Sequence, residues 1–251
     1  MLKLLGTVPL VFFIATIFIV NGFNICESWE SPLLLLLFNF VFISLLSFVV
    51  SYISLKSYLK YSSLTLLLMG AGLLSLGLGG LLGALLRSTP EGANNNVTLF
   101  NIGVFVGSIF QAAGAVLTFK GQKAGVPVKT NKLKAAFLYS GLSVLMFLVA
   151  VAAYQNVTPK FFLPEGPTLL RQAILGTSIA LLAISSFIFM VVHYRSGSDL
   201  VYWYALALAS IAIGLFAILI QQSVGCPLGW IGRAAQYMGG IYFMVAILKA
   251  K

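Results

Sequence analysis

Eight runs of about 20 apolar residues, separated by short polar stretches, constrain this chain more than any other feature. A helix of about 20 residues crosses the hydrocarbon core of a bilayer. Lipid offers no water to backbone groups, so only helices and closed barrels span it, and the alternating strands typical of a barrel are missing here. We expect helical spans at residues 4 to 20, 32 to 55, 64 to 86, 99 to 119, 135 to 153, 173 to 192, 200 to 220 and 230 to 248.

Little sequence remains outside these runs for a soluble domain. The chain has 251 residues, of which 60% are hydrophobic and 8% charged, more apolar than a water-soluble domain of this size. We therefore expect residues 1 to 251 to form one all-α domain, a polytopic transmembrane bundle with a seven-span core and an additional N-terminal span. The first span follows Lys3 and resembles a signal peptide, but its apolar run is long and no cleavage site clearly follows, so we expect it to be retained.

The basic residues indicate the orientation. Alternating the eight spans puts both termini on one side, together with 11 of the 15 lysines and arginines. By the positive-inside rule this side is cytoplasmic, which predicts a multi-pass cell-membrane protein with both termini in the cytoplasm. The other four basic residues, Arg87, Lys160, Arg171 and Arg233, fall outside. The net charge of +10 then follows from topology and lipid contact, and we expect no nucleic-acid partner.

Small residues recur at helical spacing in two of the spans. The third span has one every fourth position, and the last span has a pair near its middle. Such residues allow close helix approach. We expect tight packing, within the chain or in a homodimer, with a cavity wall as the alternative, at Ala71, Ser75, Gly79, Gly83, Gly239 and Gly240.

Polar side chains gather at the predicted outer ends of the last three spans. Arg233 lies three residues after Trp230, close enough to the outer interface for its side chain to extend to water. Snorkelling or a structural ion pair therefore explains Arg233 as well as a binding role does. The binding alternative is an outward-facing pocket for an anionic or amide-bearing ligand, because arginine offers a fork of donors. Its members would be Glu165, Arg171, Gln172, Gln221, Gln222, Arg233 and Gln236.

Other functional groups are sparse. Cys26 and Cys226 fall in predicted outer loops, where a disulfide or two free thiols are both compatible with the sequence. Asn96 and Asn156 head NVT sequences in predicted outer loops, which fits glycosylation acceptors. His193 is the only histidine and has no ligand cluster around it, so we expect neither metal nor cofactor. The residue sets of the common catalytic sites are missing, and we expect no enzyme.

Four segments resemble the N-terminal multi-span membrane region that precedes PAS and histidine-kinase modules in archaeal and bacterial sensor proteins. These are NVTLFNIG (96 to 103), GPTLLRQAILG (166 to 176), DLVYWYALALASIAIGLFAILIQ (199 to 221) and GCPLGWIGRAAQYMGGIY (225 to 242). The most specific parts are YWY and the PLGW, R, AQY and GG elements of the last segment. The resemblance covers residues 32 to 248, nearly the whole chain.

The resemblance implies a membrane-embedded sensory domain of a two-component system. It would detect an extracytoplasmic or intramembrane signal and relay it through its last helices to a cytoplasmic histidine kinase or other output partner. Histidines of that region correspond to Phe100 and Gln111 here, so no histidine ligation is carried over. The alternative from a different class is a small transporter, channel or membrane-assembly protein.

Overall fold

The computed structural model describes residues 2–23, 29, 31–121, 131–163, 166–221, 223 and 225–249, with side chains from residue 5 onward. This part of the chain is almost entirely helical, and eight of its helical segments are long and apolar enough to cross a membrane. The all-α bundle is therefore confirmed. The helices are α1 (Leu2–Phe23), α2 (Pro32–Phe38), η1 (Asn39–Leu45), α3 (Leu46–Tyr61), α4 (Leu64–Leu86), α5 (Gly92–Gly121), α6 (Lys132–Tyr154), α7 (Leu169–Ser196), α8 (Asp199–Ile220) and α9 (Pro227–Leu248).

Side-chain caps set several of the helix starts. The side chains of Ser31, Asn131 and Thr168 each accept a hydrogen bond from a backbone N–H in the first turn of α2, α6 and α7. Such a cap satisfies one of the four N–H groups that the start of a helix leaves without an intrahelical partner. The predicted spans agree with the helices, with two larger differences. The second helical segment runs to Tyr61, six residues beyond the predicted end at residue 55, and the fourth helix begins at Gly92, seven residues before the predicted start at residue 99.

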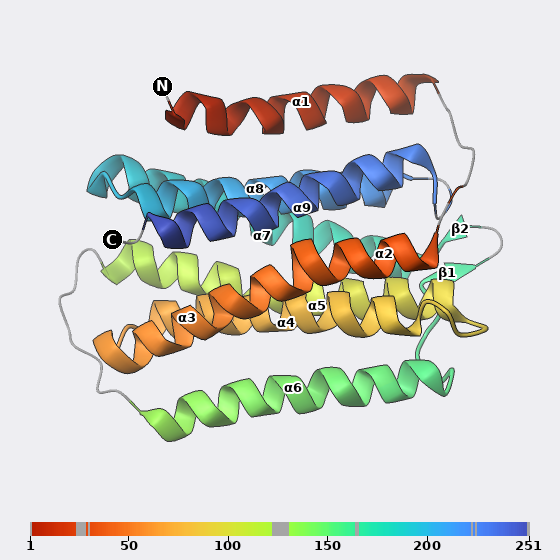
Figure 1. Cartoon of the computed structure of the whole chain (residues 1–251), viewed down its shortest axis with the longest axis horizontal. Helices are drawn as coiled ribbons and strands as arrows, with labels where there is room; N and C mark the ends of the chain where they lie inside the picture. Colours follow the sequence, from red (N-terminus) through yellow and green to blue (C-terminus); the bar gives the residue numbers. More distant parts are fainter. Residues whose placement is uncertain are drawn as a thin grey trace.

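The helices run side by side along the long axis of the molecule (Figure 1). Helix α1 lies at one edge against α8 and α9, and α6 lies at the opposite edge against α4 and α5. Helix α8 is the most buried, with 67% of its span window inside the protein, against 11% for α1. Helix α1 begins and α9 ends at the same end of the bundle, as an even number of crossings requires. Two short strands, β1 (Phe162–Leu163) and β2 (Gly166–Pro167), pair antiparallel at the other end.

The second span contains a π-helical turn. Helix α2 changes into the π-helix η1 at Asn39 and returns to α-helix at Leu46. Helix α9 packs directly on this turn: a Cβ on Gly240 would overlap the carbonyl oxygen of Phe42, and the Tyr237 hydroxyl donates to Asn39 Oδ1 at 3.0 Å. π-turns inside α-helices often occur at functional sites, so the contact between η1 and α9 marks a region of interest.

Small residues bring α4 and α5 into backbone contact. A Cβ built on Gly79 would lie 2.9 Å from Gly103 Cα, and the Ser75 hydroxyl donates to the Gly103 carbonyl at 3.1 Å. Gly83 lies against the backbone of Asn96, and Ala71 is fully buried. The small-residue face of α4 thus packs within the chain. In α9 the glycine pair divides its contacts, because Gly239 faces α8 and Gly240 faces η1.

A buried hydrogen-bond chain joins three helices in the interior of the bundle. The Tyr204 hydroxyl of α8 donates to Gln111 Oε1 at 2.7 Å, and Gln111 Nε2 donates to the Met69 carbonyl of α4 at 3.1 Å. Gln111 is 2% exposed, and its amide uses both its oxygen and its nitrogen in these bonds. Because each polar group has a partner in an apolar interior, this chain fixes α4, α5 and α8 relative to one another.

Candidate functional site

A polar pocket opens between four helical segments near the end of the bundle where α9 begins. We call it the amide pocket, because five of its lining side chains are carboxamides. It contains about 430 Å³ that protein atoms leave unfilled, and about 30 Å³ of this can hold the centre of a water molecule. The lining residues are Asn39, Asn96, Val97, Phe100, Asn101, Ile218, Gln221, Arg233 and Gln236.

Helix ends place these side chains together. Asn39 stands where α2 becomes η1, Asn96 and Asn101 lie in the first three turns of α5, and Gln221 caps the C-terminus of α8. Gln236 follows Pro227 by nine residues in α9, which puts it about 14 Å along the helix axis. The pocket therefore extends from the rim of the bundle toward its middle.

The amides of the pocket are buried yet incompletely hydrogen-bonded. Asn96, Asn101, Gln221 and Gln236 are between 1% and 8% exposed. Within the described part of the chain, Asn96 Nδ2, Asn101 Nδ2, Gln221 Oε1 and both polar atoms of the Gln236 amide have no hydrogen-bond partner. Leaving a buried polar group unsatisfied costs about 1–3 kcal/mol. A concentration of such groups around one pocket is what a site for water or a polar ligand requires.

Arg233 adds a positive charge to the pocket. Its side chain is 9% exposed, and its guanidinium carbon lies 4.9 Å from the ring centroid of Trp230. The Trp230 indole in turn donates to the Trp29 carbonyl at 2.8 Å. Stacking on an aromatic face helps to hold a guanidinium in place. Arg233 thus belongs to the pocket wall.

Arg171 lies behind the wall of the pocket instead of lining it. Its side chain is completely buried, with Nη2 donating to the Ile218 carbonyl at 2.8 Å and Cζ 4.8 Å from the Phe162 ring centroid. Nε and Nη1 have no hydrogen-bond partner among the described residues. Because Ile218 lines the pocket, Arg171 ties α7 to the segment of α8 that forms the wall.

The predicted outer cluster is therefore only partly assembled. Gln221, Arg233 and Gln236 line one pocket, Arg171 reaches its wall from behind, and Gln172 is exposed on the surface of α7. Glu165 and Gln222 lie outside the described residues. Sequence reasoning placed α7 too close to the pocket, because the start of a span specifies its depth but not which face turns inward.

Three polar pocket residues were not assigned to the site from the sequence: Asn39, Asn96 and Asn101. Placing Asn96 in an outer loop was wrong, since it lies within α5 and is 8% exposed. Asparagines favour loops, but here Asn94 Oδ1 accepts hydrogen bonds from the backbone N–H groups of Phe161 and Phe162, which supports a helix start at Gly92. Asn39 and Asn101 had a usable signal, an amide inside an apolar run.

Cys226 lies at the same end of the bundle. Cys226 is 2% exposed, immediately precedes α9 and is bonded in a disulfide. Ser223 Oγ lies 2.9 Å from its Sγ. Cys26, the only other cysteine in the sequence, lies outside the described residues.

His193 lies at the opposite end of the bundle, where neighbouring residues engage its side chain. Its Nδ1 lies 2.7 Å from the Ser198 carbonyl oxygen, and its ring packs against Tyr202 at 5.1 Å between centroids. Across the described residues, no three histidine, cysteine, aspartate or glutamate side chains gather as a metal site would need.

The fold and the amide pocket define a multi-span helical membrane protein with a buried, hydrogen-bonding cavity near one end. No family model, no curated protein and no solved structure matches the chain. Its function must therefore be inferred from the pocket and from the helices that form it.

Proposed function

We propose that this chain is a membrane-embedded receptor domain that binds a small, uncharged, hydrogen-bonding ligand in the amide pocket. The observation that carries the proposal is the set of buried amide atoms without partners around that pocket. Carboxamides both donate and accept, so a ligand with carbonyl, hydroxyl or amide groups would satisfy several of them at once.

The charge distribution supports an outward-facing pocket. Arg87, Lys160, Arg171 and Arg233 are the described basic residues at the pocket end. The end where α1 begins carries more, namely Lys56, Lys60, Lys120, Lys132, Lys134, Arg195 and Lys249. By the positive-inside rule that end faces the cytoplasm. The ligand would then arrive from outside the cell or from the outer leaflet.

Helices α8 and α9 provide the route to the cytoplasmic end. Their backbones touch, because a Cβ on Gly232 would lie 2.6 Å from the Gly214 carbonyl oxygen. The Ser210 hydroxyl donates to the Ala235 carbonyl at 2.7 Å, one residue before the pocket residue Gln236. Smooth contacts between small residues permit sliding of one helix along the other. A ligand that binds one of two packings more tightly would shift the population between them.

The resemblance to sensor membrane regions supports a cytoplasmic kinase or other signalling protein as the partner. Helix α9 both lines the pocket and ends at the proposed cytoplasmic surface, next to Lys249. A displacement of α9 would therefore reach such a partner directly.

The test is a chimera in which the chain is joined after α9 to a histidine-kinase output module. We expect Gly232→Ala, which separates α8 from α9, and Gln236→Leu, which alters the pocket, each to change kinase output severalfold at equal membrane levels. Gly176→Ala and Gln172→Leu are the matched controls, since a Cβ on Gly176 meets nothing within 4 Å and Gln172 is exposed. Kinase output that is unchanged by both test substitutions would refute the receptor proposal. A change in solute flux across proteoliposomes without a change in output would favour the transporter or channel alternative.

A further inference from the structure

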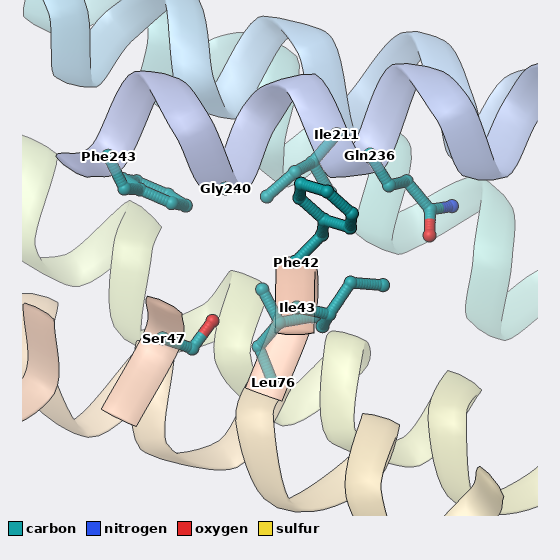
Figure 2. Close-up of a pocket in the computed structure, with 8 residues that line it drawn as sticks. All are labelled: Phe42, Ile43, Ser47, Leu76, Ile211, Gln236, Gly240 and Phe243. Carbon is teal, nitrogen blue, oxygen red and sulfur yellow. The ribbon is translucent and has the colours of Figure 1, made fainter. Parts of the chain in front are cut away.

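A second cavity lies directly behind the amide pocket, toward the middle of the bundle. We call it the apolar slot (Figure 2). It contains about 240 Å³ of unfilled space, of which about 10 Å³ can hold the centre of a water-sized sphere, so it has room for about one methyl or methylene group. Its lining residues are Phe42, Ile43, Ser47, Leu76, Ile211, Gln236, Gly240 and Phe243.

Gln236 belongs to both cavities. It lines the apolar slot and the amide pocket, and it is 3% exposed. In Figure 2 its carboxamide extends away from Phe243, so the amide stands at one end of the slot and apolar side chains surround the rest. Both polar atoms of this amide are without a hydrogen-bond partner among the described residues. An unsatisfied amide at the junction of a polar and an apolar cavity implies a ligand that spans the junction.

The walls of the slot come from the most irregular part of the bundle. Phe42 and Ile43 belong to the π-helix η1, and Gly240 of α9 leaves space because it has no side chain. Leu76, Ile211 and Phe243 add aliphatic and aromatic surface, and the polar lining side chains are Ser47 and Gln236. Such a lining favours hydrocarbon over water, since a water molecule there finds too few polar partners.

We propose that the amide pocket and the apolar slot form one elongated site for an uncharged amphiphile, with a carboxamide-like head bound by Gln236 and its neighbouring amides and a short alkyl group in the slot. This inference rests on the proposed function and adds the chemical class of the ligand. Gln236 is its specificity-determining residue, because it contacts the head where the alkyl group begins.

The experiment measures binding of a homologous series of primary amides to the full chain in lipid nanodiscs. Acetamide, propionamide, butyramide, valeramide and hexanamide are titrated, and dissociation constants are taken from the ligand-dependent midpoint of thermal unfolding. We expect affinity to rise about fourfold with the first added methylene, the value for a buried CH₂ group, and then to level off because the slot is full.

Two buried serines supply the matched variants. Ser47 lines the slot, and Ser47→Val replaces its hydroxyl by two methyl groups, which adds one non-hydrogen atom to the slot. Ser185 is equally buried, but its hydroxyl only donates to the Leu181 carbonyl of its own helix, away from both cavities. We expect Ser47→Val to remove the gain with chain length while acetamide binding stays within twofold, and Ser185→Val to preserve the full series. Gln236→Leu should weaken every member of the series about tenfold or more.

The outcomes separate this inference from the receptor proposal. If the affinity of the unaltered protein does not change along the amide series but still depends on Gln236, the role of the slot is refuted and the amide pocket stands. An equal gain in the unaltered protein and in Ser47→Val would trace the effect to lipid partitioning and would also overturn it. If no amide binds in a Gln236-dependent way, the pocket holds ordered water only, and this inference fails whatever the kinase chimera reports.

Discussion

Buried amides serve two different purposes in this protein. Gln111 joins α4, α5 and α8 with both of its polar groups bonded, whereas Gln236 has neither bonded within the described part of the chain. Both residues are almost fully buried in apolar helices, so burial alone does not separate them. The difference lies in their hydrogen bonding: a hydrogen-bonded amide stabilises the fold, and an unsatisfied amide beside a cavity is available to a ligand.

The structural amide can be tested by removal. We expect Gln111→Leu to lower the free energy of unfolding by about 1–3 kcal/mol, because the Tyr204 hydroxyl and the Met69 carbonyl lose their partner. Thermal unfolding in a fixed detergent is the measurement, and exposed Gln172→Leu is the control, expected within about 0.5 kcal/mol of the unaltered protein. Adding Tyr204→Phe to Gln111→Leu should restore part of the loss; strict additivity would contradict the hydrogen-bond explanation.

Helix pairs are held by backbone contact more than by side-chain interdigitation. The α4–α5 and α8–α9 pairs share the most contacts in the bundle, and glycine lies at the closest points of both. In lipid, where apolar side chains gain little by leaving the solvent, close packing of small residues supplies much of the attraction between helices. The same feature explains how α9 reaches the π-turn of η1 through Gly240.

Glycine substitutions should change stability in opposite directions depending on position. Gly79→Ala places a Cβ 2.9 Å from Gly103 Cα and the Leu99 carbonyl oxygen, so we expect a loss of about 1–3 kcal/mol. Gly141→Ala adds a methyl group that meets nothing within 4 Å in the middle of α6, and we expect a gain of up to about 1 kcal/mol from helix propensity. The same thermal unfolding measurement distinguishes them. Equal effects would argue against close α4–α5 packing.

The molecule as a whole presents two ends of different character. One end holds the amide pocket, the disulfide-bonded Cys226 and the β1–β2 hairpin; the other holds the start of α1, the end of α9 and most of the described lysines. This asymmetry is what a receptor needs if a ligand arrives at one surface and a partner is contacted at the other.

Orientation is measurable with single cysteines and a membrane-impermeant thiol reagent on intact cells. Asn156→Cys lies in an exposed turn after α6, at the pocket end, and we expect rapid labelling. Lys249→Cys follows α9 at the opposite end, and we expect labelling only after the membrane is permeabilised. The unaltered chain, with Cys226 in its disulfide, is the background control. Labelling of Lys249→Cys in intact cells would show that the topology is the reverse of the one proposed, and it would refute an outward-facing pocket.

What the amino-acid sequence determined by itself is the class of fold: eight apolar helices, their approximate ends, and the placement of both chain ends at one end of the bundle. This was predictable because lipid forces each backbone to satisfy its hydrogen bonds locally, so the length of an apolar run suffices to specify a helix. Residue type also singled out Arg233, Gln221 and Gln236 as polar groups near one rim.

Only the tertiary structure decided which of those groups share a cavity. The rotation of each helix depends on side chains from distant spans, and that packing turns Gln172 outward, draws the polar start of α5 inward and joins Asn39, Asn96 and Asn101 to the pocket. The contacts of α9 with η1, Tyr237 with Asn39 and Gly240 with Phe42, likewise join residues 198 positions apart. The local sequence pattern does not specify such contacts, because they depend on how whole helices pack against one another.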